Sequence, residues 1–195
     1  MLKVIQPNIT FSKPLYNRPK TERIVVHHSA SDPMTSAETM HQWHLDKGWS
    51  GIGYNYVIRG DGSIQSGRPI DKQGAHTYNY NDDGIGICLS GNFMYSPPSE
   101  LQLASLVELI RYIKGVYKKE LLIQRHKDLN PTACPGDLFP LDKLLQMLSQ
   151  PDTGETPNTL IQRALDNKLI TQAHDVKEPA TKEFVLQVGL NIIGK

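Results

Sequence analysis

Histidine and cysteine side chains that could bind a metal occur in three separate parts of the sequence. His27 and His28 end the apolar run VVHH, His126 follows a second short apolar stretch, and Cys134 lies eight residues later in the proline-bounded segment NPTACPG. Two imidazoles and one thiolate, with a fourth position left for water, form a common type of catalytic zinc site. Zinc lowers the pKa of bound water to about 7 and so supplies a nucleophile at neutral pH. The H-x7-C spacing alone is weak evidence, because it occurs by chance in many proteins.

Other uses of these side chains remain open from residue types alone. Cys134 and His126 could be a thiol nucleophile and its base, although the sequence matches no cysteine-protease signature. His41 and His44 could also bind a metal, but no third ligand lies beside them, and a packing or surface role fits them better. Cys88 could form a disulfide with Cys134, yet it lies in the apolar run GIGICL, which is typical of a buried thiol.

The segments around these residues alternate between strand and helix patterns. The sequence predicts strands in 23–30, 84–93 and 120–126, a β-hairpin in 51–70, and helices in 31–49, in 96–117 and at the end of 130–148. Such alternation around an apolar sheet predicts an α/β fold with helices flanking a central β-sheet. In the first helix, Met40, Trp43 and Leu45 are expected to form the core face.

The adjacent histidines of the first strand cannot share one site. Neighbouring side chains of a β-strand point to opposite faces of the sheet. Only one of His27 and His28 can therefore join a site on a given face, and residue types alone do not say which.

The bulk composition is typical of a globular protein. The 195 residues are 38% hydrophobic and carry a net charge of +1, which gives no reason to expect a nucleic-acid partner. No apolar stretch approaches the roughly 18 residues of a membrane span, so no membrane insertion is expected. Residues 1–22 are predicted to form an irregular N-terminal arm without a signal peptide, so we expect cytoplasmic synthesis.

The composition changes near residue 150. Residues 1–150 are predicted to form the main domain, and the Pro, Gly, Thr and Asp content of 151–158 is typical of a linker. Residues 159–195 are predicted to form a small helical segment, which is too short to bury a core of its own. It is expected to pack on the main domain, to pair with another copy or to bind a surface.

Four segments of the chain carry a family resemblance. They are VVHHSA, HQWHLDKGWSGIGYNYVIRGDGSIQSGRP, GAHTYNYNDDGIGICLSGNF and RHKDLNPTACPG, in this order. Together they resemble the type-2 N-acetylmuramoyl-L-alanine amidases, a family that includes phage endolysins and animal peptidoglycan recognition proteins. The resemblance extends over about residues 22–148. It implies a central mixed β-sheet flanked by helices, with a zinc-bearing groove on one face.

The resemblance also implies roles for individual residues. It places the zinc ligands on His27, His126 and Cys134, which leaves His28 as a structural imidazole on the opposite face. Cys134 favours catalysis, because members that only bind peptidoglycan commonly carry another residue there. Tyr54 corresponds to the active-site tyrosine, which could hold the zinc water or stabilise the oxyanion.

Further site residues follow from the same resemblance. Thr132 occupies a position where many phage enzymes have lysine, and it is expected to act catalytically through a hydrogen bond. His76 resembles a groove histidine that contacts the substrate or the oxyanion region. Asn92 and Phe93 lie where members of the family tune the choice of peptide, so they are expected to bind substrate.

The implied function is zinc-dependent hydrolysis of the amide between the lactyl group of N-acetylmuramic acid and L-alanine in peptidoglycan. A phage or prophage endolysin that reaches the cell wall with the help of a holin is the favoured role, and the C-terminal segment could bind the wall or mediate oligomerisation. The alternatives are a non-catalytic peptidoglycan-binding protein, a cytoplasmic recycling amidase and a cysteine hydrolase. No general base is identified, because none of the motifs offers an obvious carboxylate.

Overall fold

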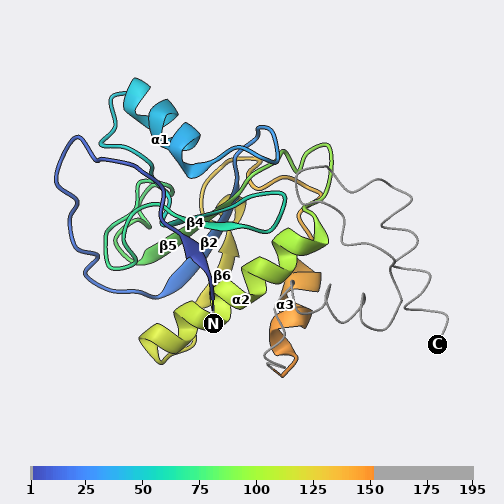
Figure 1. Ribbon diagram of the computed structural model, residues 1–195. Helices are drawn as coiled ribbons and strands as arrows, with labels where there is room; N and C mark the ends of the chain where they lie inside the picture. Colours follow the sequence, from blue (N-terminus) through green and yellow to red (C-terminus); the bar gives the residue numbers. More distant parts are fainter. Residues whose placement is uncertain (1, 152–195) are drawn as a thin grey trace, which may run out of the picture. The chain divides into compact units, whose positions relative to one another are not determined.

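Six strands form one mixed β-sheet within residues 2–151, the part of the chain that the computed structural model describes (Figure 1). The order across the sheet is β1-β4-β3-β5-β2-β6. Among these strands the β3–β4 hairpin pair is antiparallel and the other neighbouring pairs are parallel. The bounds are β1 (Val4–Ile5), β2 (Arg23–His28), β3 (Tyr56–Ile58), β4 (Ile64–Ser66), β5 (Gly84–Leu89) and β6 (Leu122–Arg125). The predicted central mixed sheet is confirmed.

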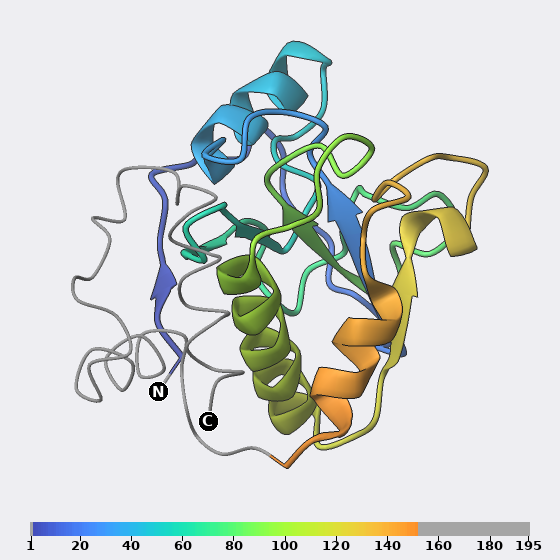
Figure 2. The ribbon, with the colours of Figure 1, turned by 90° about the vertical axis from the view of Figure 1, so that its right-hand side faces the viewer.

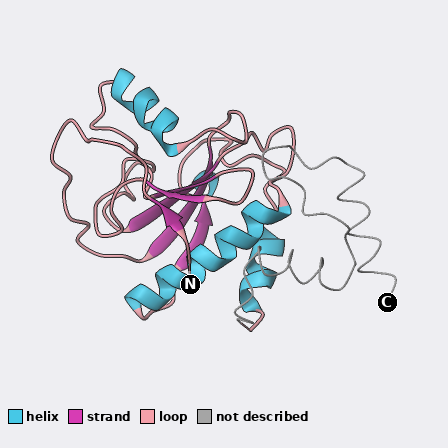
Figure 3. Cartoon of the chain, in the orientation of Figure 1, coloured by secondary structure: helices cyan, strands magenta, loops and turns pink. Residues whose placement is uncertain are grey.

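Helices cover both faces of this sheet. Helix α1 (Ala37–Asp46) lies on one face, and α2 (Glu100–Tyr117) and α3 (Leu141–Ser149) lie on the other (Figure 3). Figure 2 shows α2 and α3 side by side. None of the described helices combines the length and apolarity that a bilayer span requires. The linker predicted over 151–158, beyond Pro151, and the helical segment predicted over 159–195 lie outside the described residues.

The alternation of side chains along the strands divides the buried residues into two clusters. The larger cluster lies between the sheet and helices α2 and α3, and it includes Ile24, Val26, Ile58, Ile87, Leu89, Leu106, Leu109, Ile110 and Leu144. The smaller cluster lies on the α1 face and contains Ala37, Met40, Ile52, Val57 and Cys88. Each strand therefore contributes alternate residues to opposite faces, as a pleated backbone requires.

This alternation separates the two adjacent histidines. His27 is in register with Cys88 on β5, so it lies on the α1 face of the sheet. His28 lies on the other side, where its Nδ1 accepts a hydrogen bond of 3.1 Å from the backbone N–H of Phe93. The prediction that the two imidazoles occupy opposite faces is confirmed.

Helix α1 buries a different set of side chains from the predicted one. Met40 is buried as expected, but Trp43 is 40% exposed and Leu45 is only partly buried. His41 and His44 take their place on the buried face. The expected core face was wrong for Trp43. The buried face of α1 consists of Ala37, Met40 and these two histidines, which are three or four residues apart.

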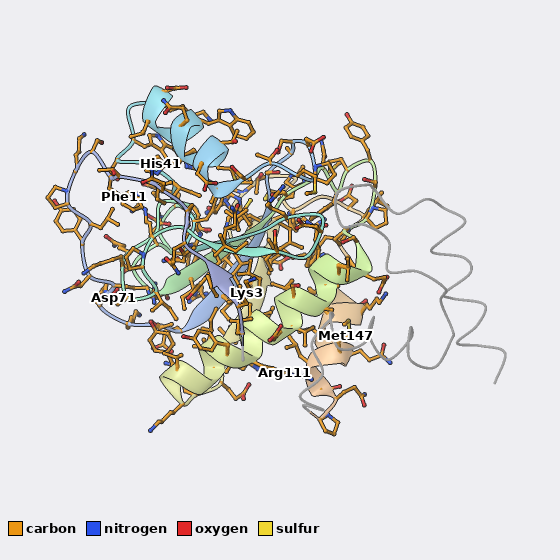
Figure 4. The ribbon with its side chains drawn as sticks, in the orientation of Figure 1. Lys3, Phe11, His41, Asp71, Arg111 and Met147 are labelled. Atoms are coloured by element: carbon orange, nitrogen blue, oxygen red, sulfur yellow. The ribbon has the colours of Figure 1, made fainter. Side chains whose placement is uncertain are left out.

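Backbone hydrogen bonds make the burial of the two histidines possible. The Nδ1 atom of His41 accepts from the N–H of Ile52 at 3.1 Å, and that of His44 accepts from the N–H of Gly53 at 2.9 Å. The ring of His41 also packs edge-on against Phe11, with ring centroids 5.3 Å apart (Figure 4). Both histidines therefore have the packing role that the sequence favoured over metal binding.

The N-terminal arm is more ordered than the sequence predicted. Val4 and Ile5 form the edge strand β1, which pairs in parallel with β4. Arg18 is 8% exposed, and its guanidinium donates to Thr21 Oγ1, to the backbone oxygens of Ile70 and Lys72, and to the hydroxyl of Tyr117. The arm is thus fixed to the domain through hydrogen bonds, which a hydrophobicity pattern does not reveal.

Candidate metal centre

Two parallel strands bring the first two candidate ligands together. Strands β2 and β6 pair in parallel, with Val26 opposite Arg125, so the residues that follow each of these lie at the same edge of the sheet (Figure 2). Those residues are His27 and His126, whose ring centroids are 4.6 Å apart. His126 opens the short 3-10 helix His126–Asp128 directly after the strand.

The loop after this short helix returns the third candidate to the same place. The backbone N–H of Lys127 donates to the carbonyl of Cys134 at 2.8 Å, which fixes the returning loop. The Sγ atom of Cys134 accepts from the N–H of His28 at 3.4 Å and lies 3.7 Å from Nδ1 of His27. A residue more than 100 positions away in the chain thereby meets the end of β2.

The three side chains fit a zinc ion. His27, His126 and Cys134 each offer one ligand atom, and these atoms all lie within 4.8 Å of one another. A nitrogen and a sulfur bound to one tetrahedral zinc at about 2.0 and 2.3 Å lie about 3.5 Å apart. The observed 3.7 Å between Nδ1 of His27 and Sγ of Cys134 is close to that value. Both cysteines are free, so the alternative of a disulfide with Cys88 does not hold.

The environment favours neutral imidazoles, which is the form that binds metals. Burial, reinforced by the neighbouring histidines, lowers the pKa of His27 well below its ordinary value. Burial also lowers the pKa of His126. For Cys134, burial raises the pKa to about 11, and the N–H of His28 opposes this shift. A cation that binds here must therefore displace the thiol proton.

Tyr54 lies beside this group, as the family resemblance implied. Its ring centroid is 5.2 Å from that of His27. Burial raises the pKa of the Tyr54 hydroxyl well above its ordinary value, and the nearby Cys88 and Cys134 thiols add to this effect. The phenol is therefore protonated at neutral pH and is suited to donating a hydrogen bond.

The sequence analysis missed two asparagines, one next to Tyr54 in the chain and one that contacts His126. Asn55 is fully buried; its Nδ2 donates to three backbone carbonyls between 3.1 and 3.4 Å, and its Oδ1 accepts from the N–H of Gly86. Asn130 places its Oδ1 3.3 Å from Nε2 of His126. In the sequence, Asn55 is marked only by its position next to Tyr54, and Asn130 only by its position in the loop after His126.

Thr132 lies in the same loop as Cys134. The side chain is exposed, and its Oγ1 accepts from the backbone N–H of Cys134 at 3.3 Å. This contact stabilises the loop that carries the thiol. The catalytic hydrogen bond expected from Thr132 stays a prediction.

The three residues expected to bind substrate have different surroundings. His76 is 9% exposed, and its Nδ1 lies 3.1 Å from Nε2 of His27. Burial lowers the pKa of His76 to about 3, so the ring is neutral. Asn92 is half-buried, and its Oδ1 accepts from the N–H of Met94. Phe93 is 2% exposed and its ring packs against Phe139, and the substrate contacts expected of Asn92 and Phe93 stay predictions.

Sequence comparison links the chain to phage endolysins and to peptidoglycan-recognition proteins. Residues 17–137 match the family model of N-acetylmuramoyl-L-alanine amidase. The chain is similar to the endolysin of Enterobacteria phage K11, with 32% identity over 126 residues that cover 61% of this chain and 83% of that protein. It is also similar to peptidoglycan-recognition protein LB of Drosophila melanogaster, with 34% identity over 124 residues, 58% of this chain and 53% of that protein.

Comparison with solved structures gives the same grouping. The N-acetylmuramoyl-L-alanine amidase LysC from Clostridium intestinale URNW superposes with a TM-score of 0.71 and 36% identity, covering 76% of this chain and 99% of that one. The wild-type Drosophila protein PGRP-LB superposes with a TM-score of 0.65 and 25% identity, covering 76% of this chain and 94% of that one. The α/β architecture and the similar sequences thus lead to the same set of proteins.

Proposed function

Since the chain belongs to the N-acetylmuramoyl-L-alanine amidase family, we propose that it is a zinc-dependent hydrolase of peptidoglycan. The bond cleaved is the amide that joins the lactyl group of N-acetylmuramic acid to L-alanine. One observation carries this proposal: His27, His126 and Cys134 offer ligand atoms within 4.8 Å of one another, inside the region that matches the family. Two nitrogens and one sulfur leave a fourth tetrahedral position for water or substrate.

A zinc ion held by these residues would polarise the scissile carbonyl and lower the pKa of the attacking water. The two neutral imidazoles and the thiolate of Cys134 supply the ligands. The backbone N–H of His28 donates to the sulfur at 3.4 Å, which stabilises the negative charge on the thiolate. The same contact fixes the direction of the sulfur, which becomes charged when a bound cation displaces its proton.

Tyr54 is the donor for the oxygen on which negative charge develops. Its raised pKa keeps the phenol protonated, so it suits the stabilisation of an oxyanion and not the removal of a proton from water. Thr132, in the loop that carries Cys134, supplies a second hydroxyl as a hydrogen-bond donor.

The biological role that we propose is lysis of the bacterial cell wall. Several of the similar proteins are phage endolysins, including that of phage K11. For this role a holin would give the protein access to the wall. The similarity to peptidoglycan-recognition proteins supports a second candidate, a module that binds peptidoglycan without cleaving it. Cys134 favours the enzyme, because a binding module has no need of a thiolate among its polar groups.

Mass spectrometry of digested peptidoglycan tests the proposal. The protein is expected to release free stem peptides that begin with L-alanine, and Cys134→Ser to release at least about 100-fold less, because a hydroxyl is a poor zinc ligand. New reducing ends on the sugars, or binding of the wall without any released peptide, would contradict the proposal.

A further inference from the structure

The ring of His76 occupies a slot that two glycines leave open. A Cβ atom built on Gly86 would lie 2.4 Å from Cδ2 of His76, and one built on Gly74 would lie 2.3 Å from the same atom. Asn81 fixes the backbone of this loop, since its Oδ1 accepts from the N–H of His76 at 2.8 Å and from that of Thr77 at 3.0 Å. The fold thus holds this imidazole in one place.

Hydrogen bonds fix which nitrogen of His76 carries the proton. Its Nε2 lies 3.4 Å from the carbonyl oxygen of Gly84, which can only accept, so Nε2 is the donor. Its Nδ1 is then an acceptor, and it lies 3.1 Å from Nε2 of His27. The hydroxyl of Thr77 lies at the same point, 2.8 Å from Nδ1 of His76 and 3.3 Å from Nε2 of His27.

The consequence for His27 is a single tautomer. Its Nε2 must donate, so its Nδ1 carries the lone pair, and Nδ1 is the atom that lies 3.7 Å from Sγ of Cys134. Asn130 fixes the tautomer of His126 in the same manner, by offering an acceptor to its Nε2. Its Nδ2 donates to the carbonyls of Tyr78 and Leu129, which turns its Oδ1 toward Nε2 of His126.

We propose that His76 is a positioning residue for the metal ligand His27, and that it does not contact the substrate. The acceptor at Nδ1 of His76 holds His27 with Nε2 protonated and Nδ1 directed at the metal. This inference rests on the proposed zinc function of the site. Hydrogen-bonded partners of metal-bound histidines fix ring orientation and raise ligand basicity, and their loss commonly weakens metal binding about 10- to 100-fold.

Zinc affinity, measured by competition with a chromogenic chelator, tests this role without any assay of activity. The variant His76→Leu removes the acceptor and is expected to weaken zinc binding about 10- to 100-fold. The variant His76→Asn carries an oxygen close to the position of Nδ1. The logarithm of its zinc affinity is expected to lie at least halfway from that of His76→Leu to that of the unchanged protein. The control is His41→Asn, which alters another buried histidine and should leave the zinc affinity within about twofold of the unchanged protein.

Metal-free samples of each variant are also melted, because a purely structural role would lower stability and leave zinc affinity unchanged. A folded His76→Leu that binds zinc as tightly as the unchanged protein overturns the inference. If the unchanged protein itself binds no zinc, the proposed function fails first.

A second measurement needs no variant and remains decisive even if His76→Leu does not fold. Long-range ¹H–¹⁵N correlation spectra of the zinc-loaded protein, labelled at histidine, report the tautomer of each imidazole. We expect His27 and His76 both to carry their proton on Nε2. A proton on Nδ1 of either ring contradicts the proposal.

Discussion

A partly buried phenol next to candidate metal ligands is suited to donate a hydrogen bond. Tyr54 lies beside His27, and burial raises the pKa of its hydroxyl. The variant Tyr54→Phe removes this donor and leaves the three ligands in place. We expect kcat on soluble muropeptides to fall about 10²- to 10³-fold, as for the loss of one oxyanion donor.

Zinc affinity provides the control for this variant. It should remain within about twofold of the unchanged protein, because no ligand is altered. If Tyr54→Phe keeps full activity, the phenol has only a packing role.

The buried His44 of α1 makes stability depend on pH. Burial, with smaller effects of Lys47, Arg68 and His41, lowers the pKa of His44 to about 4. The unfolded chain, with a histidine pKa of about 6.5, binds more protons between these two values. The contribution of His44 to the free energy of unfolding is therefore complete above about pH 6.5 and is lost as the pH falls toward about 4.

The variant His44→Asn keeps an acceptor for the N–H of Gly53 and removes the titration. Urea unfolding of metal-free protein between about pH 4.5 and 7 should show a weaker loss of stability toward acid in this variant than in the unchanged protein. Parallel pH profiles for the two proteins would mean that His44 does not titrate in this range.

At the scale of elements, the buried Asn55, directly before β3, connects that strand to β5 and to the segment after β4. The side chain of Asn55 bonds to the N–H of Gly86 on β5 and to the carbonyls of Arg68, Pro69 and Lys72. The variant Asn55→Ala leaves these buried groups without partners, and we expect a loss of about 2–3 kcal/mol in the free energy of unfolding. Urea denaturation measures it, with the exposed Asn8→Ala as a control that should change by no more than about 0.5 kcal/mol. Equal effects of the two substitutions would show that the buried hydrogen bonds contribute little.

Much of the fold was predictable because apolar periodicity and turn residues are local signals. The long helix α2 is capped by Ser99, whose side chain accepts from the N–H of Gln102 in a capping box, and the alternation of β2 correctly separated His27 from His28. Edge strand β1 was not predictable, since two residues carry no period.

The site was predictable only in part. Residue types suggested a metal site, and the family resemblance chose its members, because no local signal pairs the end of β2 with a loop that contains Cys134. The slot for His76 depends on Gly74 and Gly86, which lie in different segments, and its burial could not be inferred from sequence spacing. The burial of the two α1 histidines was not predictable for a related reason, since it depends on backbone N–H groups of the segment that follows the helix.

On the scale of the whole chain, the candidate ligands and the buried clusters belong to one compact unit, Met1–Gln150. The family match at 17–137 also lies inside it. A protein truncated after Gln150 is therefore expected to keep its zinc affinity and its activity on soluble muropeptides, with a Tm within about 3 °C of the full chain. Calorimetry and the muropeptide assay measure this.

The same truncation tests the segment 159–195. If this segment binds the wall, the truncated protein should clear a suspension of cell walls more slowly while its activity on soluble substrate stays the same. Loss of activity on both substrates would show that the segment is needed by the catalytic unit itself.

The most direct test of the metal centre is a zinc titration of chelator-treated, metal-free protein, with release of peptides that begin with L-alanine as the readout. If His27, His126 and Cys134 hold one catalytic ion, release should be absent at zero zinc, rise in proportion to bound metal, and reach its maximum at about one zinc per chain. Full release by protein shown to contain no metal, or none at one bound zinc per chain, would contradict the account.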